Sequence, residues 1–402
     1  MRVERVGTAA ELRALIPQPA SVAADVERIV ANVRAGGDAA LARYAAELDG
    51  LQESIVVPRE ELERALDALD PAVRAGLEVA RANVRAVADA WIADSRTVTL
   101  PEGHTVTVTE TPVRRAAICA PGGRNPYPSS IVMGVITARA AGVDEIVVCA
   151  PRSHPVMLAA AALCGADQFL RSGGAHTVAA LAYGTATIER VDVIAGPGGP
   201  YVQEAKRRVF GDVGIDMFAG PSDLMIVAGP GVDDEAVVAD LLAQAEHGAG
   251  SLAILVCFGS ELLDFASERA AAAPGDATVA LLQTDDPLAA IEEFAPEHLQ
   301  LVGDRAEALA PAVRHAGCIL IGPAAGTAFS DYVAGSNHTL PTDGAARFAS
   351  GLNPGHFRRR VSEIRLDRTA AARLATAGVP IAEAEGFPQH AHSMALRQNG
   401  ER

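Results

Sequence analysis

An adjacent glutamate and histidine, Glu297 and His298, are the residues of this sequence whose types most directly suggest chemistry. They stand in FAPEHLQLV (294–302), after a proline and between an expected helix and an expected strand. A carboxylate beside an imidazole provides two general bases with different pKa values. The same pair also fits an ordinary helix end, so its meaning depends on the residues that meet it in the fold.

A second candidate lies in DLLAQAEHGAG (240–250), where Gln244 and His247 are three residues apart in an expected helix. This spacing places both side chains on one face, where they can share a metal ion. The alternative is a surface helix with an isolated histidine.

Asp331, Asn337 and His338 are grouped in the glycine-containing segment SDYVAGSNHTLPT (330–342). It follows the strand-like run CILIG (318–322), which favours a site at the carboxyl edge of a sheet. The alternative is a capped turn in which Asp and Asn bind nearby backbone groups.

Two glycine-rich loops each follow a strand-like run and precede an expected helix, APGGRNPYPSS (120–130) and AGPGGPY (195–201). Such loops let backbone N–H groups approach a phosphate at the helix N-terminus. Neither has the G-x-G-x-x-G spacing, so a tight strand-to-helix crossover is the alternative.

The tail segment AEAEGFPQHAH (382–392) contains Glu383, Glu385, His390 and His392. A solvated charged helix is the ordinary reading of such a segment. The same side chains can instead line a site or reach into a neighbouring subunit.

The elements that must position these residues follow from hydrophobic periodicity. Residues 21–48 and 59–93 have helical spacing, and residues 104–110 alternate as a strand. From about residue 115, short apolar runs alternate with helices, which is typical of wound parallel sheets. We therefore predict an α/β fold with two incomplete Rossmann-like domains and small N-terminal and C-terminal helical appendages. The expected domains are an N-terminal segment (1–20), a discontinuous α/β domain carrying most candidate site residues (21–114 and 224–351), a Rossmann-like domain on the dinucleotide side (115–223) and a helical tail (352–402).

The composition restricts the classes of partner. A formal net charge of -16 disfavours nucleic acid and anionic membranes as main partners. The start of the chain lacks the pattern of a signal peptide, and no apolar run has the length of a membrane span. The five cysteines are scattered singly, which is typical of reduced cytosolic thiols. We expect a cytoplasmic protein.

Taken together and in this order, the motifs resemble the histidinol dehydrogenase family. The resemblance covers about residues 20–397, and its longest run is AKRRVFGDVGIDMFAGPS (205–222). Further similar stretches are PGGRNPYPSS (121–130), GGAHTVAALAYGT (173–185), GPG (196–198), DLLAQAEH (240–247), APEHL (295–299), SDYVAGSNH (330–338), LPTDGAARFASGL (340–352) and AEAEGFPQH (382–390).

The resemblance implies oxidation of L-histidinol to L-histidine in histidine biosynthesis, in two steps with two NAD and an enzyme-held aldehyde. It implies that His298 takes the alcohol proton and that Glu297 activates the water that attacks the aldehyde. It further implies a homodimer with a shared active site, in which zinc mainly orients the substrate. The implied zinc ligands are Gln244, His247, Asp331 and a partner-subunit His390, with His392 as the alternative tail ligand, and the other implied substrate contacts are Ser222, His338 and Glu385.

Three positions differ from the family pattern where the family contacts the dinucleotide. Cys119 replaces a tyrosine, His176 replaces a glutamine and Gly199 replaces an asparagine. The choice between NAD and NADP therefore stays open, as do two other functions. One is a paralogous dehydrogenase acting on another small alcohol, such as a sulfonated diol, with Arg124 as a candidate for binding an anionic group. The other is a zinc-binding homologue that has lost redox activity.

Overall fold

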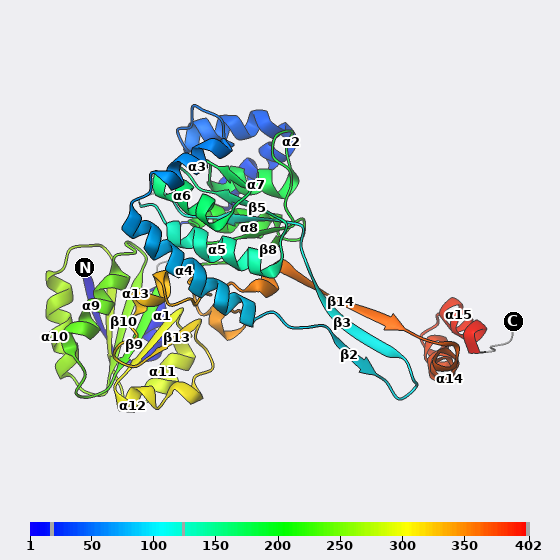
Figure 1. Ribbon diagram of the computed structural model, residues 1–402. Helices are drawn as coiled ribbons and strands as arrows, with labels where there is room; N and C mark the ends of the chain where they lie inside the picture. The colour runs from blue at the N-terminus through cyan, green and yellow to red at the C-terminus, as the bar shows by residue number, and fades with distance from the viewer. Residues whose placement is uncertain (17–19, 123–124, 399–402) are drawn as a thin grey trace. The chain divides into compact units, whose positions relative to one another are not determined.

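A computed structural model shows two compact units, each with its own sheets. The first contains two parallel sheets with helices on both faces, which confirms the predicted α/β class (Figure 1). The structure describes residues 1–16, 20–122 and 125–398. The first unit comprises Met1–Trp91 and Val113–Phe357, and the second comprises Ile92–Pro112 and the described residues from Arg358 onward.

One sheet of the first unit has five parallel strands in the order β6-β5-β4-β7-β8. Successive residues of a strand face opposite sides, so Ile118 packs in one core layer and Ala117 in the other. The strands are β4 (Arg115–Cys119), β5 (Glu145–Cys149), β6 (Gln168–Leu170), β7 (Val193–Ala195) and β8 (Gly214–Ile215), and the intervening helices are α5 (Pro128–Ala141), α6 (Pro155–Cys164), α7 (Gly174–Tyr183) and α8 (Pro200–Val209).

The early helices cover this five-stranded sheet. Helix α2 (Ala23–Leu48) packs on α7 and α8, α3 (Arg59–Asp67) packs on α6, and α4 (Pro71–Ala90) packs on α5. The sequence analysis had assigned residues 21–114 to the other sheet, and that assignment is wrong. An amphipathic helix shows which of its faces is buried, but not which sheet buries it.

The second sheet of this unit has six parallel strands in the order β1-β11-β10-β9-β12-β13. Helices α9 and α10 cover one face, while α1, α11 and α12 cover the other. The strands are β1 (Arg2–Val6), β9 (Asp223–Ala228), β10 (Leu252–Cys257), β11 (Thr278–Gln283), β12 (His298–Val302) and β13 (Cys318–Ile321), and the helices are α1 (Ala9–Ala14), α9 (Asp234–Ala245), α10 (Glu261–Ala272), α11 (Pro287–Phe294), α12 (Asp304–Glu307) and α13 (Thr327–Tyr332).

The sequence analysis had predicted a separate N-terminal segment (1–20), but the described residues at the N-terminus belong to this sheet. Strand β1 pairs with β11 at the sheet edge, and Leu12 of α1 is fully buried. Between β12 and β13 the chain forms only the short α12 followed by the 3-10 turn η1 (Ala310–Ala312). Two further 3-10 turns lie at Ala345–Arg347 and Pro354–Phe357.

The second unit combines a three-stranded antiparallel sheet with a helix pair. Its strand order is β14-β3-β2, and α14 packs against α15. The tail is therefore not purely helical, and the sheet draws two of its strands from the segment before residue 113. The elements are β2 (Arg96–Thr99), β3 (Thr105–Pro112), β14 (Arg358–Arg365), α14 (Arg368–Ala384) and α15 (Pro388–Gln398). Across the described residues, every helix is too short or too polar to cross a membrane.

Candidate active site

The candidate site lies at the amino edge of the six-stranded sheet. Asp223 and His298 are the first residues of β9 and β12, and Ser251 directly precedes β10. The sequence had favoured a carboxyl edge, the usual position in wound sheets. The difference arises because α9 runs back across the sheet, so its last turn brings Gln244 to the edge where the strands begin.

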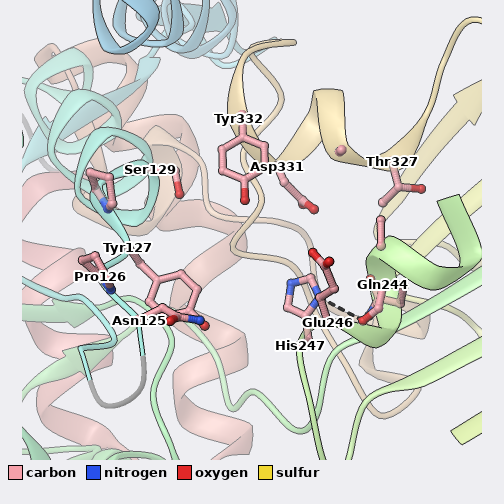
Figure 2. A pocket seen from close by; sticks show the side chains of 13 residues that line it. Asn125, Pro126, Tyr127, Ser129, Gln244, Glu246, His247, Thr327, Asp331 and Tyr332 are labelled. Atoms are coloured by element: carbon pink, nitrogen blue, oxygen red, sulfur yellow. Dashed lines mark hydrogen bonds between the residues drawn. The ribbon is translucent and has the colours of Figure 1, made fainter. Parts of the chain in front are cut away.

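A small polar cavity of about 230 Å³ opens beside this edge. Figure 2 shows side chains from three segments around it: the start of α5, the end of α9 and helix α13. This volume is below the roughly 300–1,000 Å³ typical of pockets for drug-sized ligands, which fits a small substrate. The lining residues are Asn125, Pro126, Tyr127, Pro128, Ser129, Ala243, Gln244, Glu246, His247, Thr327, Ala328, Asp331 and Tyr332.

Glu297 is held rigidly just behind the cavity. Its Oε2 accepts hydrogen bonds from Ser222 Oγ at 2.6 Å and from the backbone N–H of Asp223 at 2.9 Å. In return, the backbone N–H of Glu297 donates to Asp223 Oδ1 at 2.8 Å. Burial raises the pKa of the Glu297 carboxyl above its ordinary value. A carboxyl group with a raised pKa is a stronger base once it is ionised.

His298 is buried between carboxylates. Its Nε2 lies 3.4 Å from Asp331 Oδ1, and its Nδ1 lies 3.9 Å from Glu297 Oε2. Burial disfavours the imidazolium, but the hydrogen bond to Asp331 and the charges of Glu297 and Asp331 outweigh that effect and raise the pKa of His298 to about 9. Because Asp331 also lines the cavity, it connects His298 to that cavity.

Three of the predicted zinc ligands meet in this cavity. Gln244 is 2 % exposed, and its Oε1 has no hydrogen-bond partner. His247 Nδ1 bonds the backbone oxygen of Gln244 at 3.0 Å, which leaves Nε2 as the ring nitrogen with a lone pair (Figure 2). Asp331 supplies a carboxylate on the facing helix.

This donor set fits a zinc ion, which accepts imidazole nitrogen and carboxylate or amide oxygen. Among the described residues, no three His, Cys, Asp or Glu side chains come together at a metal-binding distance. Gln244 adds an amide oxygen to the two other donors that line the cavity. His247 lies in the turn after α9, not within the helix as the spacing had suggested.

His338 links the cavity wall to the other sheet's helices. Its Nδ1 donates to the backbone oxygen of Asp331 at 2.7 Å, and its Nε2 lies 3.2 Å from Ser130 Oγ of α5. Burial lowers the pKa of His338, so the neutral ring donates at one nitrogen and accepts at the other. Its neighbour Asn337 bonds Met133 O and Thr137 Oγ1, which is a structural role.

The residues predicted to contact a dinucleotide occupy the carboxyl edge of the five-stranded sheet, and two of them are internal. Cys119 is 5 % exposed with its Sγ 3.3 Å from Cys149 Sγ. His176 is 1 % exposed, and its Nε2 is 3.1 Å from Asp49 Oδ2. Gly199, in contrast, is exposed at the start of α8 with open space beside it. Of the three predicted dinucleotide contacts, Gly199 alone leaves room for a ligand to approach the backbone.

Glu385, His390 and His392 belong to the second unit, where the ring of His390 packs at 5.3 Å from that of Phe387. Arg124 lies outside the described residues.

The sequence analysis missed two buried polar residues beside the site, Asp223 and Ser251. Each is the last polar residue before a long apolar strand run, LMIVA (224–228) or LAILVCF (252–258). A polar residue at a buried strand start needs a partner, and that signal was available in the sequence.

Two wound sheets, a small polar cavity and a buried pair of bases define an enzyme that acts on a small molecule. A sequence profile of the histidinol dehydrogenase family matches residues 16–398. A histidinol dehydrogenase from Parasynechococcus marenigrum is 38% identical over 94% of this chain and 92% of its own length. One from Rhizobium meliloti is 41% identical over the same shares.

A solved structure gives the same result. The crystal structure of histidinol dehydrogenase from Elizabethkingia anophelis superimposes with a TM-score of 0.90 at 28% identity, covering 99% of this chain and 98% of that one. The chain belongs to the histidinol dehydrogenase family and is an oxidoreductase.

Proposed function

We propose that this enzyme oxidises L-histidinol to L-histidine in histidine biosynthesis, with zinc bound and NAD as the electron acceptor, through an aldehyde that stays on the enzyme. The observation that carries the proposal is the cavity itself. Gln244, His247 and Asp331 all line it, and Glu297 and His298 lie behind them, within contact of Ser222 and Asp331.

Gln244, His247 and Asp331 would hold the metal, with a fourth ligand from His390 or His392 of the partner subunit. A bound zinc ion supplies a Lewis acid that orients the amine and imidazole nitrogens of the substrate. The buried, unpartnered Oε1 of Gln244 supports this role, because an unsatisfied polar atom in a protein interior is costly without a ligand.

His298 and Glu297 divide the proton chemistry of the two steps. His298 removes the alcohol proton as hydride leaves, because hydride departs more readily from an alkoxide. Without metal, the Asp331 carboxylate helps to keep the ring protonated; a metal ion on that carboxylate would lower the pKa of His298 and leave the ring neutral, able to accept the proton. Glu297 then removes a proton from the water that attacks the aldehyde. Ser222 and the N–H of Asp223 keep the Glu297 carboxylate in place through both steps.

NAD, when bound, supplies the hydride acceptor. Gly199 is the predicted contact that is open to a ligand, whereas Cys119 and His176 are enclosed by their own chain. NADP remains the alternative acceptor, because no acidic residue at a Rossmann ribose position identifies NAD.

We further propose a homodimer with a shared site. The second unit has an uncovered apolar sheet face, where Val98, Val106 and Ile364 stand side by side in register and Val98 and Ile364 are exposed. Uncovered apolar surface of this kind is typical of protein interfaces. We propose that a second copy of the chain covers this face, which would bring the tail histidines of one subunit near the cavity of the other.

The test is to incubate the zinc-loaded protein with L-histidinol and either NAD or NADP, and to follow both the reduced dinucleotide and the appearance of histidine. We expect histidine with one of the two acceptors. A sulfonated diol serves as the comparison substrate, since the enclosed Cys119 and His176 favour a paralogue. Oxidation of the diol alone would replace the proposal, and no reduction with any substrate would favour a zinc-binding homologue without redox activity.

A further inference from the structure

A chain of hydrogen bonds at the amino edge of the six-stranded sheet fixes the side chain of Gln244. Gln244 Nε2 lies 3.0 Å from Ser222 Oγ and 3.3 Å from Ser251 Oγ. Ser251 is 4 % exposed and has no role in the chemistry described above.

The protons of both hydroxyl groups are already used elsewhere. Ser222 Oγ donates to Glu297 Oε2 at 2.6 Å, and Ser251 Oγ donates to the backbone oxygen of Gln244 at 3.0 Å. A hydroxyl group has a single proton, so each serine can only accept a hydrogen bond from the amide of Gln244. The group that faces them must therefore be the NH₂ group of the amide.

This arrangement determines which atom of Gln244 remains for a ligand. With both serines occupied by the NH₂ group, the carbonyl Oε1 is the free end of the amide, and it has no partner in the described structure. An amide nitrogen has no lone pair to give to a cation, whereas an amide oxygen does. A flipped amide would present the wrong atom.

Ser251 also acts on the second ligand residue. The same backbone oxygen of Gln244 that accepts from Ser251 accepts from His247 Nδ1 at 3.0 Å. The hydroxyl group thus holds both the side chain of Gln244 and the carbonyl that orients the His247 ring.

We propose that Ser251 is a positioning residue, whose hydroxyl group locks the Gln244 amide with its oxygen toward the metal and steadies the carbonyl that orients His247. This rests on the zinc site of the proposed function. Partners of metal ligands typically contribute about 10- to 100-fold to metal affinity, and Ser251 belongs to that group.

The test measures zinc affinity of the full-length metal-free protein by competition with a chromophoric chelator, at a temperature well below unfolding. We expect Ser251→Ala to weaken zinc binding by about 10- to 100-fold. Ser251→Cys keeps the volume of the side chain but accepts hydrogen bonds poorly, so it should weaken binding in the same direction. Ser251→Thr keeps the hydroxyl group and should restore most of the affinity.

Ser172→Ala is the matched control, because Ser172 is a fully buried hydrogen-bonded serine in the connection between β6 and α7 of the five-stranded sheet. It removes the same group and should leave zinc affinity unchanged. A native protein that binds no zinc would overturn the proposed metal site together with this inference. If the native protein binds zinc and the Ser251→Ala and Ser251→Cys variants bind it with the same affinity as the native protein, the role of Ser251 alone would be overturned.

Discussion

At the scale of single residues, two buried carboxyl groups face each other behind the cavity. Asp223 and Glu297 exchange hydrogen bonds through their backbone N–H groups. Burial and the charge of Glu297 raise the pKa of Asp223 from 3.8 to about 8. Asp223 thus resists ionisation in the folded protein, which keeps negative charge concentrated on Glu297.

Asp223→Asn should change how the free energy of unfolding depends on pH. The folded pKa lies above the unfolded one, so the native protein loses stability as pH rises from about 4 toward 8, whereas asparagine has no proton to lose. We expect the free energy of unfolding of the variant, relative to the native chain, to increase by about 1 kcal/mol or more between pH 5 and pH 8. Urea unfolding of both proteins with a metal chelator present measures it, and a difference independent of pH would contradict the account.

The two bases should separate the two oxidations. His298→Asn removes the acceptor of the alcohol proton and should slow the first oxidation by about 10²- to 10⁴-fold. Glu297→Gln keeps the shape and should block mainly the conversion of aldehyde to acid. Single-turnover assays started from the alcohol or from the aldehyde compare them, and equal slowing of both halves by both variants would refute the division of roles.

Residue types and spacing identified part of this site. Glu297 and His298 are adjacent in sequence, so no folding was needed to bring them together. The contact of His298, at the start of β12, with Asp331 of α13 joins residues far apart in sequence and was not visible from spacing. The burial of His176 was not visible either, because it stands near the start of a helix yet is enclosed with Asp49.

At the scale of elements, a buried ion pair holds the loop between β7 and α8. Lys206 and Asp216 are both fully buried, and Lys206 Nζ bonds Asp216 Oδ1 and the backbone oxygen of Gly196. Asp216 Oδ2 accepts from Gly196 N at 2.7 Å. Gly196 needs this fixed position, since its φ is +110° and a Cβ would collide with Cys119 O.

Lys206→Met should therefore destabilise the protein strongly, because Asp216 would keep a buried charge without its partner. The expected loss is about 3 to 5 kcal/mol of unfolding free energy, with part of it recovered in the double variant Lys206→Met, Asp216→Asn. Arg207→Met, at the exposed neighbouring position, is the control and should change stability by about 0.5 kcal/mol or less. Comparable losses in both single variants would contradict the role of the ion pair.

Most strands of the two wound sheets were predicted from their apolar runs, because parallel strands are buried on both faces. Strands β1 (RVERV) and β14 (RRRVSEIR) escaped detection, since each lies at a sheet edge and is rich in charge. The packing of α2 to α4 on the five-stranded sheet depends on contacts distant in sequence, which periodicity does not encode.

At the scale of the whole molecule, the cavity of one chain supplies Gln244, His247 and Asp331, while the tail histidines belong to a separate compact unit. The shared site that we propose for a symmetric dimer would account for both observations, because each tail would then complete the cavity of its partner.

Complementation tests this sharing. His247→Ala and His390→Ala should each be inactive alone, since each loses a metal ligand. Hybrid dimers formed by co-expression contain one intact site, so activity should return to about a quarter of the native level. Hybrids of His247→Ala with Glu297→Gln serve as the control, because both changes affect the cavity side and no intact site can form. Recovery in the control, or no recovery with either His390→Ala or His392→Ala, would contradict a shared site.

The central claim, that one site carries L-histidinol through two oxidations, is tested most directly by stoichiometry. The zinc-loaded enzyme is given excess NAD and a limiting, known amount of L-histidinol, and the reaction runs to completion. The account predicts two NADH and one histidine for each histidinol, with no free aldehyde. One NADH per histidinol with aldehyde released would contradict it, because the site would then perform only the first oxidation.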